Sequence, residues 1–253
     1  MFELDKIYQG NCLDLIKDMP DNFVDVCFTS PPYNRVRNDV YEKYDDTLQD
    51  YCKMLCDITD EMLRVSKGYV IVNLQCHAFN KVEFYTYLGK YADKINGTVI
   101  WHRTNPRPSS NYDEETNTRS ITNTRSITNA FEYFFVIRDG KSFRSYGRDN
   151  FNNVIQSTVN PFTVDGHKAI MHRDVCMTML SKFTKENDTI LDPFFGTGTT
   201  GVCALELGRH FIGFEIVPDY IKYAEQRIYC EKNGIDENSM LFKKESQYQN
   251  KLF

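Results

Sequence analysis

The residues best suited to chemistry follow a short apolar run at residues 24–28. Residues 29–34 read TSPPYN and combine hydroxyls, two prolines and an aromatic ring. The prolines remove two backbone N–H donors and stiffen the chain, so the flanking carbonyls are free to accept hydrogen bonds. Tyr33 offers a flat face on which a planar ring can stack, and Ser30 adds a side-chain acceptor. Such a segment suits a planar amine, although Pro-Pro-Tyr alone is equally consistent with a turn that closes a strand.

A second candidate is the run DPFFGTGTT at residues 192–200, which follows the apolar residues 189–191 and opens a helical pattern. In an α/β sheet this junction lies at the carboxyl end of a strand, where ligands bind. Gly196 and Gly198 allow a tight turn and close approach of a ligand, and the helix that follows presents free N–H groups. No lysine follows the glycines as in a P-loop, and the third glycine of the dinucleotide-binding GxGxxG pattern is absent.

Glu215 ends the apolar run at residues 210–215 and falls 23 residues after Asp192. An acidic side chain about 20 residues beyond a glycine turn can accept hydrogen bonds from ribose hydroxyls. Alone, a glutamate at a strand end would be an ordinary surface residue. Together with the glycine turn, it indicates a ligand that carries a ribose.

The elements that must position these residues alternate between apolar, β-branched runs and helical patterns. We expect strands at 24–28, 69–74, 98–102, 131–137, 189–191 and 210–215, and helices at 45–65, 173–184, 199–208 and 218–232. This alternation predicts a single α/β domain over residues 1–253, with a mostly parallel twisted sheet and helices on both faces. The short connection before the strand at 131–137 predicts a local antiparallel element.

In combination, the motifs resemble the DNA amino-methyltransferases of the β class, in which the catalytic motif precedes the cofactor motif. TSPPY resembles the catalytic motif, DPFFGTGTT the cofactor motif and HFIGFEI the ribose-binding strand. Further segments are similar to the family in the family's order: IYQGNCLDLIKDMPDNFVDVCF, RVSKGYVIVNL, WHRTNPRPSS and HKAIMHRDVCMTMLSKFTKENDTILDPF. The resemblance covers nearly the whole chain and implies the Rossmann-like fold of S-adenosylmethionine-dependent methyltransferases.

The resemblance also implies a site. Residues expected to bind S-adenosylmethionine are Asn11, Cys12, Thr29, His167, Lys168, Asp192, Pro193, Phe194, Gly196, Gly198, Thr199, Thr200 and Glu215. Residues expected to hold the target base are Ser30, Pro31, Pro32 and Tyr33. The chain departs from the family at Asn11, where aspartate is usual, and near His167, where Lys168 and His172 stand in place of prolines.

The reaction implied is methylation of an exocyclic amino group of a base that is flipped out of double-stranded DNA. The Ser30 side chain and the Pro31 carbonyl would bind the amino hydrogens while Tyr33 stacks on the ring. No Pro-Cys dipeptide is present, which argues against a cytosine-C5 nucleophile. Serine before Pro-Pro-Tyr favours cytosine N4 in this family, with adenine N6 as the alternative.

DNA contacts are expected from a local concentration of positive charge, because the chain as a whole carries a net charge of −5. Residues 103–168 are polar and loop-rich, and we expect them to form an insertion that recognises the target sequence. The candidate DNA-binding residues are Arg35, Arg37, Arg103, Arg107, Arg119, Arg125, Arg144 and Arg148. The sequence NTRSIT occurs at 117–122 and again at 123–128, either as a local duplication or as two Arg-Ser pairs for phosphates.

The bulk sequence predicts a cytoplasmic protein, since it shows neither a secretory signal nor an apolar run of membrane-spanning length. Its eight cysteines include no CxxC pair and are expected to be reduced, without a metal site. A homodimer and a cognate restriction endonuclease are the expected protein partners. Two other functions remain open: a methyltransferase acting on RNA or on protein glutamine, and a non-catalytic nucleic-acid-binding subunit.

Overall fold

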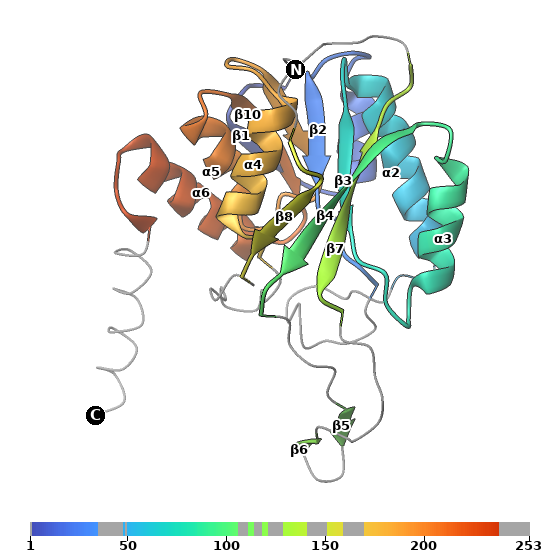
Figure 1. The fold of residues 1–253 in the computed structure, drawn as a ribbon. Coiled ribbons are helices and arrows are strands. Elements are labelled where there is room, and N and C mark those ends of the chain that lie inside the picture. Colours follow the sequence, from blue (N-terminus) through green and yellow to red (C-terminus); the bar gives the residue numbers. More distant parts are fainter. Residues whose placement is uncertain are drawn as a thin grey trace, which may run out of the picture.

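The computed structural model describes residues 2–34, 48, 50–105, 111–113, 118–120, 129–140, 151–158 and 170–237, with the backbone alone for 111–113 and 118–120. An eight-stranded sheet forms the centre of this part of the chain, in the order β1-β10-β9-β2-β3-β7-β4-β8 (Figure 1). Its strands are β1 (Lys6–Gln9), β2 (Val26–Thr29), β3 (Val70–Leu74), β4 (Ile95–Arg103), β7 (Phe131–Ile137), β8 (Val154–Ser157), β9 (Thr189–Asp192) and β10 (His210–Glu215). A separate antiparallel pair joins β5 (Asn111–Asp113) to β6 (Thr118–Ser120).

The sheet is parallel from β1 through β10, β9 and β2 to β3. Strand β7 then runs antiparallel to both of its neighbours, β3 and β4. Strand β8 lies parallel to β4 at the edge. The predicted antiparallel element is therefore real, and it lies inside the sheet because β7 inserts between β3 and β4.

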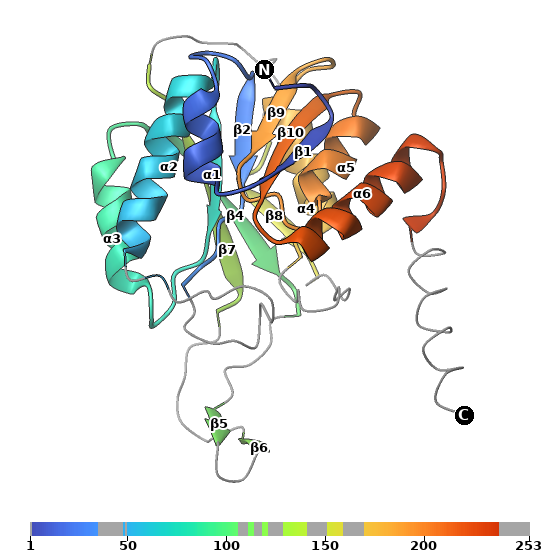
Figure 2. The same ribbon diagram turned by 180° about the vertical axis from the view of Figure 1, so that it is seen from behind.

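Helices cover both faces of the sheet, as predicted (Figures 1 and 2). One face carries α1 (Cys12–Leu15), α2 (Tyr51–Val65) and α3 (Lys81–Lys90), and the other carries α4 (Arg173–Phe183), α5 (Thr199–Glu206) and α6 (Pro218–Lys232). Strand β3 shows how the sequence builds two cores: Val70 and Val72 belong to the cluster under α2, whereas Ile71 belongs to the cluster under α4. Alternate side chains of a strand point to opposite faces, so a fully apolar strand feeds both clusters.

All six predicted strands are present, with bounds shifted by a few residues. The sequence reading missed β1, β8, α1 and α3. Strands β1 and β8 are only four residues long and partly exposed, so their patterns are too short to stand out. The helix predicted at 45–65 is α2, whose described part begins at Tyr51 after Asp50.

The predicted insertion at 103–168 contains two strands of the main sheet, β7 and β8, together with the small β5–β6 pair. Figure 1 shows that pair away from the sheet, beyond the edge at which β4 ends. No helix in the described part of the chain is long and apolar enough to cross a membrane. All eight cysteines are free thiols, and five of them are buried.

Candidate active site

The two predicted motifs meet because β2 and β9 are parallel neighbours. Val26 pairs with Ile190, and Cys27 with Leu191, so both strands end at the same edge of the sheet. The hydroxyl of Thr29 donates a 2.7 Å hydrogen bond to Asp192 Oδ1. Segments 29–33 and 192–200, far apart in sequence, thereby become one site.

Asp192 is a buried junction between these segments. Its Oδ1 also accepts from the backbone N–H of Phe194 at 3.1 Å, and its Oδ2 accepts from the Thr200 hydroxyl at 2.6 Å. Burial raises the pKa of Asp192 to about 6, and the three donors oppose that rise. The carboxylate thus ties the end of β2 to the glycine turn and to the first turn of α5.

The glycine turn depends on backbone conformations that L side chains rarely adopt. Gly196 has φ 54° and Gly198 has φ 82°. A Cβ atom on Gly198 would lie 2.8 Å from the Cβ of Ala224 on α6. Gly198 is required both by its left-handed backbone and by its close approach to a neighbouring helix.

Glu215 closes the turn from the adjacent strand, β10. Its Oε2 accepts from the Gly196 N–H at 2.7 Å, while its Oε1 accepts from the N–H groups of Ile216 and Val217 at 2.9 and 2.8 Å. Burial raises the pKa of this carboxyl above its ordinary value, and the backbone donors partly offset the rise. Three backbone donors fix both oxygens at the rim of a cleft.

The cleft has a volume of about 180 Å³ and gathers predicted residues from both motifs and from α1. Those lining it are Asn11, Cys12, Ser30, Pro32, Pro193, Phe194, Gly196 and Glu215, joined by Gly10, Leu13, Leu48, Met54, Phe214, Ile216, Val217 and Tyr220. Thr29, Thr200 and Asp192 are buried behind it. Asn11 caps α1, since its Oδ1 accepts from the Leu13 N–H at 2.9 Å, as an aspartate would.

Ser30 and Tyr33 share an acceptor that the sequence reading missed. The Ser30 hydroxyl donates to Oδ1 of Asn73 at 3.1 Å, and the Tyr33 oxygen lies 2.7 Å from the same Oδ1. The Asn73 amide N–H donates to the carbonyl of Tyr133, which fixes its oxygen toward the two hydroxyls. The Tyr33 oxygen also lies 2.9 Å from Glu132 Oε2, so its single proton is donated to one of these two acceptors at a time. The sequence does hold a sign of Asn73 and Glu132, because each is a polar residue inside an otherwise apolar strand, VIVNL and FEYFFVI.

Tyr33 differs from the expectation of an open stacking face. Its side chain is only 6% exposed and belongs to the hydrophobic cluster under α2. Its carbonyl accepts from Asn80 Nδ2 at 2.9 Å and lies 2.9 Å from His77 Nε2. Stacking on a base would therefore require neighbouring side chains to move away from the ring.

Arg103, predicted to bind DNA, makes its described contacts within the protein. Its side chain is 14% exposed and forms an ion pair with Glu132, at 3.3 Å between Nη1 and Oε1. Its Nη2 donates to the carbonyl of Asn129 at 2.5 Å. The role of Arg103 in DNA binding stays a prediction.

The other predicted arginines lie where the structure describes no side chain: Arg35, Arg37, Arg107, Arg119, Arg125, Arg144 and Arg148. His167 and Lys168 likewise fall outside the described residues. Their roles stay predictions.

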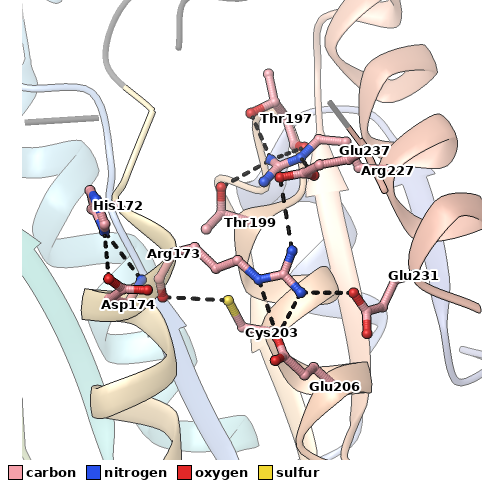
Figure 3. Close-up of polar contacts among 10 residues, drawn as sticks. All are labelled: His172, Arg173, Asp174, Thr197, Thr199, Cys203, Glu206, Arg227, Glu231 and Glu237. Carbon is pink, nitrogen blue, oxygen red and sulfur yellow. Dashed lines mark hydrogen bonds and ion pairs between the residues drawn. The ribbon is translucent and has the colours of Figure 1, made fainter. Parts of the chain in front are cut away.

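A buried arginine supports the glycine turn from behind (Figure 3). Arg227 on α6 donates to the Thr197 carbonyl at 2.8 Å and to the Thr199 hydroxyl at 3.0 Å, and pairs with Glu237 at 2.9 Å. The sequence analysis did not identify Arg227. Helical spacing could have indicated that it is buried, because it falls on the same face of α6 as the buried Tyr220 and Ala224.

Comparisons with solved structures find the same architecture in other proteins. The chain is similar to PvuII DNA methyltransferase (cytosine-N4-specific), with a TM-score of 0.70, 16% identity, and coverage of 92% of this chain and 87% of the other. It is also similar to TTHA0409, a putative DNA modification methylase from Thermus thermophilus, with a TM-score of 0.63, 20% identity, and coverage of 89% and 93%. These likenesses establish the α/β fold.

Sequence comparisons give the family. The chain is 25% identical to the type II methyltransferase M.HinfI of Haemophilus influenzae, over 89% of this chain and 68% of that protein. It is 26% identical to the type II methyltransferase M.BglII of Bacillus subtilis, over 92% and 76%. Residues 24–226 match the family model described as DNA methylase (N6/N4). Because this match includes both motifs and the sheet that joins them, the protein belongs to the N6/N4 DNA methylase family.

Proposed function

We propose that this protein transfers a methyl group from S-adenosylmethionine to an exocyclic amino group of a base flipped out of double-stranded DNA. The observation that carries the proposal is that one cleft is lined by both motifs. Ser30 and Pro32 lie on its wall together with Phe194, Gly196 and Glu215. A group transfer needs donor and acceptor held side by side, and such positioning supplies much of the catalysis.

The cofactor end of the cleft fits an adenosine with a charged tail. An ionised carboxylate has about four acceptor positions. Glu215 uses three for backbone N–H groups, which leaves capacity for a ribose hydroxyl. Asn11 and Cys12 lie on the adenine side, and the turn at 193–198 holds the methionine part. S-adenosylmethionine supplies an electrophilic methyl group at this site.

The acceptor end orients an amine. Ser30 donates its proton to Asn73, so its oxygen can accept a hydrogen from the target amino group. The Pro31 carbonyl accepts the second amino hydrogen. These two contacts leave the nitrogen lone pair directed along the cleft. After transfer the nitrogen loses a proton to solvent, because the Asn73 amide cannot act as a base.

We favour cytosine N4 as the target, because serine before Pro-Pro-Tyr goes more often with cytosine N4 in the family that the sequence resembles. Adenine N6 is the alternative. Target recognition falls to residues 103–168 and the predicted arginines outside the described residues. A homodimer, a cognate restriction endonuclease and a cytoplasmic location complete the proposal; the names of the type II relatives M.HinfI and M.BglII favour a restriction-modification role.

The test is incubation with methyl-labelled S-adenosylmethionine and DNA of mixed sequence, followed by nucleoside analysis by mass spectrometry. N4-methylcytosine is the expected product. N6-methyladenine would retain the site and correct the base. A parallel incubation with RNA tests the RNA alternative, which label on RNA and not on DNA would favour. Failure to bind the cofactor would favour a non-catalytic subunit.

A further inference from the structure

Three polar side chains from neighbouring strands meet beside Tyr33. Each lies two residues along its strand from a buried apolar residue: Asn73 from Ile71 on β3, Glu132 from Phe134 on β7, and Arg103 from Trp101 on β4. Because alternate residues share a face, all three polar side chains continue the apolar row toward the same edge of the sheet. Trp101 pairs with Glu132 and Asn73 with Phe134, so the register brings the three together.

Glu132 is central to this group. Its side chain is 9% exposed, and each oxygen has a different partner: Oε2 accepts from the Tyr33 hydroxyl, and Oε1 pairs with Arg103. Arg103 also holds the carbonyl of Asn129, whose amide donates to the Cys76 carbonyl at 2.6 Å. The carboxylate is thus fixed by a cation that is itself anchored to the start of β7.

Such a pair contributes little to stability. Removing two charges from water costs about as much as their attraction returns, and apolar residues of similar volume often stabilise a fold as well or better. In addition, the Nε of Arg103 is buried and has no hydrogen-bond partner among the residues that the structure describes. Stability alone therefore gives no account of a charged pair at this position.

We propose that Glu132, held by Arg103, is a positioning residue for the methyl transfer proposed above, on which this inference rests. The Tyr33 hydroxyl lies 3.2 Å from the Ser30 oxygen and 2.7 Å from the Asn73 oxygen, to which Ser30 can donate. A hydrogen bond to a charged acceptor is about twice as strong as one between neutral groups, so the single Tyr33 proton goes to the Glu132 carboxylate and leaves the Asn73 oxygen to Ser30. Ser30 then directs its proton inward to Asn73 and presents lone pairs to the cleft.

Loss of the carboxylate would loosen this arrangement. Tyr33 and Ser30 would rearrange around the Asn73 oxygen, and Ser30 would point its proton into the cleft for part of the time. In that orientation it would donate to the lone pair of the target amine and block the nucleophile. The proposed cofactor contacts at Glu215, on β10, and at Gly196, in the turn after β9, lie outside these three strands and would be unchanged.

The experiment compares Glu132→Gln, the double variant Glu132→Leu/Arg103→Met and the control Lys90→Gln, which breaks an exposed ion pair with Asp60 on the far helices. For each we would measure kcat and KM on DNA, Kd for S-adenosylmethionine, and Tm. A misplaced reacting group can cost up to about 100-fold in rate. We expect kcat to fall about 10- to 100-fold in both Glu132 variants, with cofactor Kd unchanged, and to stay at the wild-type value in Lys90→Gln.

The double variant replaces both buried charges with apolar side chains, so its Tm should equal or exceed that of the wild type. If it folds and retains wild-type kcat, the pair is structural and the inference falls, while the proposed function stands.

A second test starts from Tyr33→Phe, which lacks the hydroxyl that Glu132 positions. Adding Glu132→Gln to this variant should reduce its kcat by less than about threefold. Full additivity of the two changes would also overturn the inference. A wild-type protein that binds the cofactor but methylates no DNA would overturn the proposed function, and this inference with it.

Discussion

The hydroxyl of Thr29 is bonded to the carboxylate of Asp192 at 2.7 Å, across 163 residues of sequence. Thr29 is the last residue of β2 and immediately precedes Ser30, whereas Asp192 is the last residue of β9 and begins the glycine turn. Each residue is buried, so the bond is shielded from water. It fixes the distance between the segment proposed to hold the base and the segment proposed to hold the cofactor.

Replacing Thr29 by valine should destabilise the protein. Valine has nearly the same shape but cannot donate, and the loss of a partner to a buried charged acceptor costs about 1–3 kcal/mol. Urea denaturation would measure the free energy of unfolding. Thr29→Ser keeps the hydroxyl and should stay closer to the wild type; equal losses in the two variants would indicate that packing, and not the hydrogen bond, is responsible.

The stability contribution of Asp192 should depend on pH. Burial raises its pKa to about 6 in the folded protein, against about 3.9 in an unfolded chain. The folded state therefore binds the Asp192 proton more tightly than the unfolded state does. The stabilisation that results is complete below about pH 4 and is lost as the pH rises through 6. A shift of that size corresponds to about 3 kcal/mol.

Asp192→Asn has no carboxyl to titrate at this position. Denaturation of both proteins at several pH values from 4 to 7 should therefore show the wild type losing about 2 kcal/mol more than the variant over that range. Parallel pH profiles would contradict this account of Asp192.

A methyl group at Gly198 should damage the cofactor turn. Alanine there would adopt an unfavourable left-handed backbone and place its Cβ 2.8 Å from Ala224. We expect a loss of about 1–3 kcal/mol in unfolding free energy and weaker binding of S-adenosylmethionine. Gly89 on α3 is the matched control, because a Cβ there meets nothing within 4 Å. Gly89→Ala should stabilise the protein by about 0.5–1 kcal/mol, and equal effects at both sites would refute the argument.

Glu215→Gln should weaken cofactor binding. The glutamine amide must turn its N–H₂ group toward at least one of the backbone donors at Gly196, Ile216 or Val217, and that donor then lacks an acceptor. Losing charge-assisted hydrogen bonds should raise Kd for S-adenosylmethionine about 10- to 100-fold, as measured by calorimetry. Glu225→Gln changes an exposed residue of α6 and should leave Kd unaltered.

The sequence predicted the elements whose apolar patterns are long or whose motifs are specific. The strands carrying TSPPY and DPFFGTGTT, and the helices after them, form as expected because each strand is fully buried and each turn has distinctive residues. The structure brings the two motifs together because β2 and β9 are parallel neighbours that end at one edge of the sheet.

The sequence did not predict which side chains of different strands contact each other. Asn73 and Glu132 could be seen as polar interruptions in apolar strands, but only the position of β7 between β3 and β4 brings them to Tyr33. Arg103 lies in a basic region whose charge predicts DNA contacts, and nothing in the sequence indicates its ion pair with the buried Glu132. Tyr33 is a residue type that can stack on a base, but its ring is buried by side chains that are remote in sequence, which the sequence alone does not reveal.

The pairing of β4 with β7 has an evolutionary consequence. These strands are antiparallel neighbours, and the Arg103 N–H bonds to the Ala130 carbonyl at 2.7 Å, so the ends of the connection between them are fastened together by the sheet itself. The entropy of closing a connection changes only slowly with its length, so gaining or losing one six-residue NTRSIT unit alters the cost by about 0.2 kcal/mol. Natural variation can therefore lengthen, shorten or rewrite this stretch, which we propose recognises the target sequence, while the reaction centre is inherited intact.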